Sequence, residues 1–279
     1  MSGPAGFVTR FAPSPTGLLH RGHAFSALLA SDAAANAGGR FLLRIEDIDA
    51  ARCREAFAGA IFEDLAWLGI AWEPPVVFQS RRMAAYGAAL ERLKAAGLVY
   101  RCFKTRAEVL ARIGHAPHGA QAPYVGAAPE PAEEARLLAS GAPFAWRLSI
   151  AAAEAALGGF ADLVFADDGR GHIVADPWRS GDVVLARKDL GVAYHLAVVV
   201  DDAEAGVTLV VRGEDLIEAC HVQRLLQALL GLPTPTYRHH PLILRPDGKR
   251  FAKRDTAETL RALRERGMTG AALRAELGL

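Results

Sequence analysis

The first hundred residues alternate between strand patterns and helix patterns, and this alternation limits the fold more than any other feature of the sequence. Two segments have the composition of strands, Phe7–Phe11 and Arg40–Ile45. Three amphipathic segments predict helices, which are Gly22–Ala37, Arg54–Leu68 and Arg81–Ala96. Strands and helices that alternate across short connections predict a parallel sheet covered by helices.

The middle of the chain has a different character. Residues 114–131 are crowded with Pro, Gly and Ala and predict a loop. Short strand patterns separated by turns then predict a smaller insertion of mixed α and β structure, at Phe144–Ile150, Gly171–Val174 and Asp182–Arg187. The second half of the sheet is expected to follow, with strands at Ala197–Val200 and Thr208–Val211 and a helix at Ile217–Leu230. Residues 256–279 predict two short helical pieces.

Length and composition bound the class of protein. The 279 residues suffice for one large domain or two modest ones, and a net charge of +1 argues neither for nor against a nucleic-acid partner. Cys53, Cys102 and Cys220 are too few and too scattered for a disulfide framework, which favours a reducing compartment. With neither a signal-peptide pattern at the start nor an uninterrupted apolar run of about 18 residues, we expect a cytoplasmic protein without a membrane span.

The segment from Pro13 to His23 carries the sharpest chemical signal. His20 and His23 flank Gly22 where a predicted strand gives way to the start of a helix. A helix N-terminus has unpaired N–H groups and a positive dipole, so it attracts phosphate, and imidazoles there can stabilise charge that moves onto pyrophosphate. A loop with two surface histidines is the alternative, and this short motif by itself leaves both open.

The wider sequence resembles the class I glutamyl-tRNA synthetase family. The resemblance begins with residues 10–17 (RFAPSPTG) and the histidine motif. It continues in order through RIEDID at 44–49, WLG at 67–69, QSR at 79–81, YHLAVVVDD at 194–202, RGEDL at 212–216 and RFAKR at 250–254. These motifs span residues 7–254.

This resemblance implies a domain organisation. A Rossmann-type catalytic core, with a parallel sheet and helices on both faces, is expected at residues 1–100 and 183–245. A smaller α+β connective insertion that contacts RNA is expected at 101–182. The second ATP loop and a helical tail are expected at 246–279, without an anticodon-binding domain.

The segment from Arg250 to Arg254 resembles that second ATP loop. A loop with three cations can close over a triphosphate, and Lys253 would act as a point charge on the leaving pyrophosphate. In isolation, the same run would be a solvated basic loop. Three residues depart from the family's usual pattern. Arg250 replaces a lysine, Ala252 replaces a serine, and Arg21 replaces the apolar residue before Gly22. Because Lys253 is kept, we expect an altered rate rather than inactivity. The resemblance implies that ATP is bound by Pro13, Gly22, His23, Arg250, Lys253 and Arg254, with His20, His23 and Lys253 as catalytic residues and Mg²⁺ bridging the phosphates.

A glutamate site follows from the resemblance and from charge. Glutamate has two carboxylates and one ammonium group, so its pocket needs cations and an anion. Arg10 and Arg212 can each grip a carboxylate in a bidentate manner, and Glu46 can pair with the ammonium. Tyr194 offers a hydroxyl, and Ala12 and Ser14 offer further contacts. A metal site at Glu46, Asp47 and Asp49 is a weaker alternative, because no histidine accompanies these acids.

Relatives often hold a structural zinc ion in the insertion, and here its ligands are replaced. Lys104 follows Cys102 where a second cysteine is usual, and Ala128 follows Tyr124 where the last cysteine is usual. The spacing of His115 and His118 matches no zinc pattern. One thiolate and one phenol cannot hold tetrahedral Zn²⁺, so we predict no structural zinc.

The tail leads to a specific expectation about the acceptor. After Arg254 only 25 residues remain, too few for the family's anticodon-binding domain. Truncated members of the family transfer activated glutamate to queuosine in the anticodon of tRNA(Asp), and the resemblance implies that reaction here. The insertion would then hold the anticodon stem-loop, with RNA contacts from Trp146, Arg147, Trp178 and Arg179, although packing explains each of these side chains as well.

Three alternatives remain open at this stage. A shortened synthetase would charge a tRNA 3′ end, and a catalytically silent paralogue would only bind tRNA or adenylate. A small-molecule nucleotidylyltransferase would share the histidine motif but not the glutamate pocket. We expect L-glutamate, ATP and queuosine-bearing tRNA(Asp) as partners of a monomeric enzyme.

Overall fold

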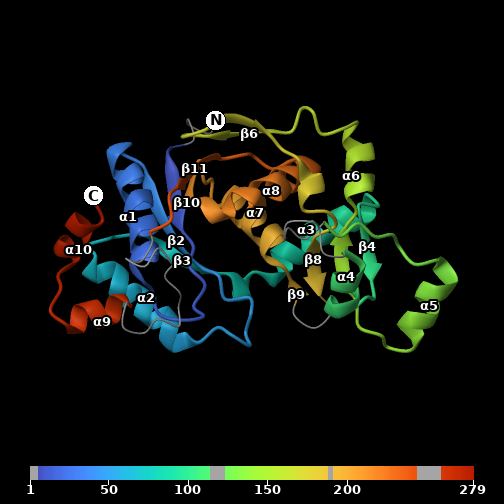
Figure 1. Ribbon diagram of the computed structural model, residues 1–279, viewed down its shortest axis with the longest axis horizontal. Coiled ribbons are helices and arrows are strands. Elements are labelled where there is room, and N and C mark those ends of the chain that lie inside the picture. The colour runs from blue at the N-terminus through green and yellow to red at the C-terminus, as the bar shows by residue number, and fades with distance from the viewer. Residues whose placement is uncertain (1–5, 114–122, 188–190, 244–258) are drawn as a thin grey trace.

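The computed structural model describes residues 6–113, 123–187, 191–243 and 259–279 (Figure 1). Its central feature is a parallel sheet. Strands β1 (Val8–Phe11), β2 (Arg40–Ile45) and β3 (Glu73–Phe78) pair in that order. Strands β10 (Leu209–Gly213) and β11 (Thr236–His240) form a second parallel pair. The N–H of Thr208 donates to the carbonyl of Val8 at 2.9 Å, so β10 lies beside β1 and the strands run β3-β2-β1-β10-β11.

Alternating side chains of the central strands face two separate cores. Leu209 and Val211 pack with helices α1 (Arg21–Asn36) and α2 (Glu55–Trp67). Val210 packs on the opposite side, in the core that contains α3 (Met83–Ala95), α7 (Tyr194–Glu204) and α8 (Ile217–Leu230). Because neighbouring residues of a strand point to opposite faces, helices cover both sides of the sheet. The predicted α/β fold with a parallel sheet is confirmed.

The predicted strand at Ala197–Val200 is wrong, because these residues lie within helix α7. Every residue from Leu196 to Asp202 is buried. A short apolar run buried on all sides has the same composition in a central strand and in a core helix, so periodicity cannot separate the two. The other elements of this part, β10 and α8, agree with the predicted segments.

The stretch between α3 and α7 builds a smaller antiparallel sheet. Its strands are β4 (Val99–Cys102), β5 (Ala145–Leu148), β8 (Val184–Arg187) and β9 (Gly191–Val192). Helices α4 (Arg106–Ile113), α5 (Pro131–Ala139) and α6 (Ile150–Leu157) accompany it on the side of the molecule away from α1 and α2 (Figure 1).

One hairpin from the same stretch joins the main sheet instead. Strands β6 (Val164–Asp167) and β7 (Gly171–Val174) are antiparallel, and β6 pairs in parallel with β11. Three short 3-10 helices complete the secondary structure of the described residues, at Gln79–Arg81, Pro177–Arg179 and Glu214–Leu216. The intervening chain therefore contributes to both sheets.

The C-terminal residues form the two predicted short helices, α9 (Leu260–Glu265) and α10 (Gly270–Glu276). They pack against the N-terminal half: Leu260 donates to the carbonyl of Leu19 at 2.8 Å, and Arg274 forms an ion pair with Asp32 at 2.7 Å. Arg21, the unusual residue of the histidine motif, pairs with Glu276. None of the described helices is both long and apolar enough to cross a bilayer.

Candidate active site

A cavity of about 450 Å³ opens where β1, β2 and β10 end. It brings together ten residues that the sequence analysis predicted to bind glutamate or ATP, namely Arg10, Ala12, Pro13, Ser14, His20, Gly22, His23, Glu46, Tyr194 and Arg212. Carboxyl ends of parallel strands are where open α/β sheets bind ligands. The remaining predicted residues, Arg250, Lys253 and Arg254, lie outside the described part of the chain.

The two histidines cap helix α1. The Nδ1 of His20 accepts a hydrogen bond from the N–H of Gly22 at 3.2 Å, and the Nδ1 of His23 accepts from the N–H of His20 at the same distance. Because both Nδ1 atoms act as acceptors, a neutral ring carries its proton on Nε2, the atom that can donate to a ligand. A Cβ on Gly22 would lie 3.2 Å from the ring of His20, so glycine leaves room for this cap.

Two residues at this end of the cavity escaped the sequence analysis. His240 accepts from the hydroxyl of Ser26 through Nε2 at 2.6 Å, because its Nδ1 donates to the carbonyl of Pro241 at 2.9 Å. Burial lowers the pKa of His240, which favours the neutral ring. Ser26 lies one helical turn after Gly22, but His240 carries no sequence signal because it arrives from the end of β11.

At the other end of the cavity, Arg10 is held by a buried charge network. Its Nε donates to Asp202 at 3.1 Å, and Arg44 donates to the same carboxylate oxygen at 2.5 Å and to Glu46 at 3.1 Å. Burial opposes the charged form of Asp202, but the nearby Arg10 and Arg44 outweigh it and lower its pKa. For Glu46, burial outweighs the attraction of Arg44 and raises the pKa.

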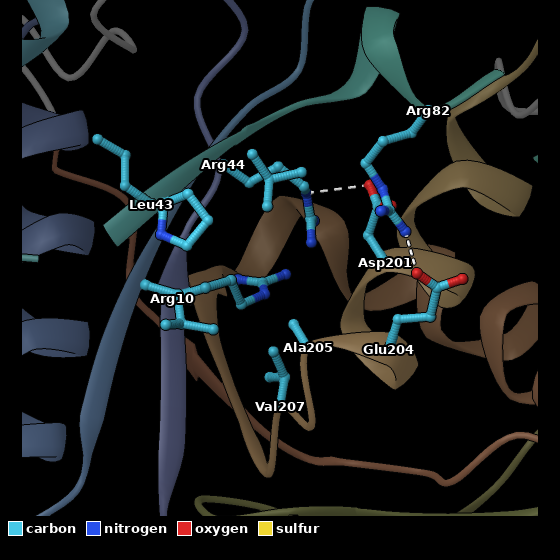
Figure 2. A pocket seen from close by; sticks show the side chains of 11 residues that line it. Arg10, Leu43, Arg44, Arg82, Asp201, Glu204, Ala205 and Val207 are labelled. Atoms are coloured by element: carbon cyan, nitrogen blue, oxygen red, sulfur yellow. Dashed lines mark hydrogen bonds and ion pairs between the residues drawn. The ribbon is translucent and has the colours of Figure 1, made fainter. Parts of the chain in front are cut away.

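The neighbouring carboxylate of Asp201 contacts the same network, at 3.7 Å from the Nε of Arg44. Figure 2 shows a smaller cavity there, with Arg10 and Arg44 facing Arg82 and Asp201. Asp201 accepts from the Nε of Arg82 at 2.7 Å, and also from Gln79 and from Tyr86 at 2.8 Å each. Arg44 and the two aspartates are positioning residues that the sequence analysis recorded only as parts of motifs.

Arg212 is held differently, by neutral groups. Its Nε donates to the Nε2 of His239 at 3.2 Å and its Nη2 to the thiol of Cys220 at 2.8 Å, while Tyr237 lies beneath the guanidinium at 5.1 Å. The residue is only 5% exposed, and its buried Nη1 has no hydrogen-bond partner among the described residues. One edge of the guanidinium is therefore occupied, and the bidentate grip that we predicted has to use the Nη1 end.

The match to a protein-family model decides the family. Residues 7–279 match the model described as tRNA synthetases class I (E and Q), catalytic domain. The chain belongs to this family. It is accordingly an enzyme of the ligase type, similar to aminoacyl-tRNA synthetases, and class I synthetases use ATP with Mg²⁺.

Individual relatives of this class I synthetase cover most of the chain. It is 46% identical to the glutamyl-Q tRNA(Asp) synthetase of Rhodobacter capsulatus over 98% of its own length and 100% of the relative, and 44% identical to that of Nocardia farcinica over 91% and 78%. A crystal structure of a glutamate tRNA ligase from Elizabethkingia meningosepticum, in complex with its amino acid, superposes with a TM-score of 0.75 at 29% identity. The match covers 90% of this chain, which spans about half of that ligase, 52%.

The alternative of a metal site at the acidic run gains no support in this class I synthetase. Glu46 pairs with Arg44, Asp47 accepts from Ser80 at 2.6 Å, and Asp49 pairs with Arg52 at 2.6 Å. These carboxylates have separate partners. Within the described ranges, the structure contains no cluster of three His, Cys, Asp or Glu side chains that could hold a metal ion.

The region of the family's zinc site contains a small buried cluster. The Sγ of Cys102 lies 3.8 Å from the hydroxyl of Tyr124, and Tyr100 donates to Asp182 at 2.7 Å. Lys104 and Ala128, which replace the usual cysteines, are exposed. His115 and His118 lie outside the described residues.

The four residues that we considered for RNA contacts all have protein partners. The Trp146 ring lies 4.3 Å from the ammonium of Lys94 and 4.5 Å from the guanidinium of Arg101. The remaining contacts are Arg147 over the ring of Tyr124, Trp178 to Glu154, and Arg179 to Glu218. Contacts within the protein therefore account for each of these side chains.

Proposed function

We propose that this enzyme activates L-glutamate with ATP and transfers the glutamyl group to queuosine in the anticodon of tRNA(Asp). The observation that carries the proposal is one cavity that is lined both by the histidine-capped start of a helix and by Arg10, Arg212 and Glu46. The nature of the acceptor is supported by the R. capsulatus relative, which the chain covers over its whole length.

The charges of the cavity complement those of glutamate. The unpaired Nη1 of Arg212 can receive one carboxylate, and the free edge of Arg10 can receive the other. The carboxyl group of Glu46, which lies 3.1 Å from Arg44, can pair with the ammonium group. Tyr194 stays protonated because burial raises the pKa of its hydroxyl, so it can donate a hydrogen bond.

The histidine end suits the chemistry of adenylate formation. The ionised α-carboxylate of glutamate attacks the α-phosphorus of ATP, the bond to the β-phosphate oxygen breaks, and pyrophosphate leaves, so a general base is not required. His20 and His23 donate hydrogen bonds to the phosphates through Nε2. Mg²⁺, when bound together with ATP, would neutralise phosphate charge.

Support for the second ATP segment comes from the described residue that follows it in the chain. We retain Lys253, with Arg250 and Arg254, as the cations that stabilise the leaving pyrophosphate. Thr259, the first described residue after this segment, forms a β-bridge with His20. The chain therefore resumes beside the histidine motif, which supports a shared role in binding ATP.

A second cavity adjoins the first and suits the incoming nucleoside. It shares Ser14, Glu46 and Tyr194 with the first cavity and is also lined by Arg52 and Arg187. A hydroxyl of the queuosine cyclopentenediol would attack the carbonyl carbon of glutamyl-adenylate there, with AMP as the leaving group. The insertion at 101–182 would bind the anticodon stem-loop, and we propose a cytoplasmic monomer.

Charging assays with radiolabelled glutamate test the acceptor. We expect glutamate to be incorporated into tRNA(Asp) that carries queuosine, but not into tRNA(Asp) without queuosine or into tRNA(Glu). Incorporation into tRNA(Glu), or equal incorporation into both forms of tRNA(Asp), would instead support a shortened synthetase that charges a 3′ end. The same assay with tRNA(Asp) that lacks its 3′-terminal adenosine separates the two attachment sites, because glutamate is then incorporated only where the queuosine diol is the acceptor.

A further inference from the structure

A buried pair on the two neighbouring strands β6 and β11 lies directly behind Arg212. Asp167 ends β6, and His239 lies on β11, which pairs with β6 at Tyr237 and Asp167. The carboxylate of Asp167 is 2.5 Å from the Nδ1 of His239, and both side chains are fully shielded from solvent. Asp167 also accepts from the N–H of Gly169 at 3.1 Å, which fixes the carboxylate at the turn of the hairpin.

The chemistry of the pair selects one tautomer of His239. A carboxylate can only accept, so the Nδ1 of His239 carries the proton. Burial lowers the pKa of His239, and this effect is larger than the opposing effect of the hydrogen bond that the ring donates to Asp167, so the ring is neutral. Its Nε2 then has a free electron pair and accepts from the Nε of Arg212 at 3.2 Å.

The remaining contacts of Arg212 point the same way. The thiol of Cys220 accepts a hydrogen bond from the Nη2 of Arg212 at 2.8 Å. Its sulfur is 3.7 Å from the Nε2 of His239, so both groups contact the same edge of the guanidinium. Burial outweighs the attraction of Arg212 and raises the pKa of Cys220, so the thiol is neutral as well. The guanidinium is thus fixed on one edge without a direct anionic partner, and Nη1 is the buried donor left for a ligand.

We propose that Asp167 and His239 are positioning residues for the amino-acid substrate, which act by orienting Arg212. Asp167 holds His239 as the tautomer that accepts from Arg212, and this contact aims the Nη1 end of the guanidinium into the cavity. The proposal rests on the proposed activation of glutamate. It also connects the β6–β7 hairpin, which the sequence places within the insertion, to the amino-acid pocket.

A neighbouring pair, with Asp168 directly after β6 and Arg238 on β11, gives a matched control. Asp168 and Arg238 follow and precede the proposed pair by one residue and form an ion pair at 2.5 Å. Their side chains are 49% and 40% exposed, and neither lines the cavity. If weakening the contact between β6 and β11 were enough to raise the KM for glutamate, Asp168→Ala would raise it too. If the effect depends on the orientation of Arg212, Asp168→Ala leaves the KM unchanged.

The test measures glutamate-dependent ATP–pyrophosphate exchange in the full chain, with separate titrations of glutamate and ATP. His239→Asn keeps a donor for Asp167 but lacks an acceptor that reaches Arg212, and we expect the KM for glutamate to rise about 10- to 100-fold. His239→Gln places an amide oxygen near the position of Nε2 and is expected to restore part of this loss. Asp167→Ala should resemble His239→Asn, and Asp167→Asn, which keeps an acceptor, should be milder.

The split between constants separates positioning from loss of fold. We expect the KM for ATP to stay within about twofold in every variant, and Asp168→Ala to behave as wild type. An unchanged KM for glutamate in both His239→Asn and Asp167→Ala would overturn the proposal, as would an equal rise in Asp168→Ala. If the wild-type enzyme itself shows no exchange with glutamate, the proposed function fails and the substrate role of the pair falls with it.

A second measurement is independent of activity. In ¹⁵N-histidine-labelled protein, long-range nitrogen–proton spectra report which ring nitrogen carries the proton. We expect His239, assigned by its loss in His239→Gln, to be protonated on Nδ1 in the wild type and to lose this preference in Asp167→Ala. Protonation of His239 on Nε2 in the wild type would overturn the proposal even if the enzyme is active.

Discussion

The two arginines of the amino-acid pocket are fixed by opposite means. Arg10 belongs to a group in which Arg10 and Arg44 are balanced by Asp202 and Glu46. Arg212 contacts a neutral imidazole and a neutral thiol, and its compensating carboxylate is one residue further away. The comparison shows that Arg10 is paired directly with a carboxylate of the protein, whereas Arg212 has no anionic partner in direct contact.

This difference predicts that the stability of the fold depends strongly on Asp202, the carboxylate that pairs with Arg10. Asp202→Ala would leave both Arg10 and Arg44 buried without that partner, and losing one side of a buried ion pair costs about 3–5 kcal/mol. We expect the free energy of unfolding in urea to fall by about this amount. Asp168→Ala, in an exposed pair, should cost less than about 1 kcal/mol. Similar urea midpoints for the two variants would contradict the charge network.

The Arg212 side should lose substrate binding rather than stability. Arg212→Gln removes a cation whose direct neighbours His239 and Cys220 are neutral, so no group in contact with the guanidinium is left as an unpaired charge. Loss of a buried charged contact to the ligand, about 2–5 kcal/mol, predicts a fall of at least about 30-fold in kcat/KM for glutamate. Arg10→Gln is measured in parallel, for both the free energy of unfolding and the KM for glutamate. If Arg212→Gln lowers the free energy of unfolding as much as Arg10→Gln does while leaving the KM for glutamate unchanged, the two arginines are not different in the way proposed.

The stabilising contributions of His195, near Arg212, and of Asp202, beside Arg10, should also depend differently on pH. Burial, together with the charge of Arg212, lowers the pKa of His195 to about 4 from its usual 6.5. The unfolded chain then binds a proton at His195 before the folded one does, so the stabilising contribution is present above pH 6.5 and is lost as the pH falls toward 4. It amounts to about 3 kcal/mol for this shift.

The measurement is the free energy of unfolding at several pH values between 7.5 and 4. His195→Gln should give a flatter profile over this window than the wild type. The contribution of Asp202, whose pKa is lowered from 3.8, is retained throughout this range. Identical slopes for wild type and His195→Gln would show that His195 is not held neutral in the fold.

The smallest effect is expected at Cys220. A serine hydroxyl can accept from the Nη2 of Arg212 as the thiol does, although it is shorter. We expect Cys220→Ser to change the KM for glutamate by no more than about threefold, a loss of under about 1 kcal/mol. Cys220→Val, which cannot accept, should have a larger effect. A large loss in Cys220→Ser with none in Cys220→Val would show that the contact does not orient Arg212.

Much of the site was predictable because its residues lie in motifs at the ends of elements. Arg10, Glu46 and Arg212 close or follow strands, and His20 begins a helix, so a parallel sheet brings them to one edge. Their partners could not be found in this way. Asp202 lies 192 positions from Arg10, and Asp167 lies 72 from His239, so their roles arise only when distant segments pack together.

The main error in the fold has a related cause. Ala197–Val200 has the composition of a buried strand, and only its packing between other elements makes it helical. Similarly, the β6–β7 hairpin looks like part of the insertion in the sequence, yet β6 pairs with β11 of the main sheet. Local patterns predict which segments are regular, but not which neighbours a buried segment selects.

The most direct test of the account is ATP–pyrophosphate exchange by the purified wild-type enzyme, with each of glutamate, glutamine and aspartate in turn. A pocket with a guanidinium at Arg212 that has no anionic partner in direct contact, and with a second arginine at Arg10, predicts exchange with L-glutamate and little with glutamine, which lacks the second carboxylate. The absence of exchange with glutamate, in the presence or absence of tRNA, would contradict the account. Equal exchange with glutamine would show that the two arginines do not read the two carboxylates.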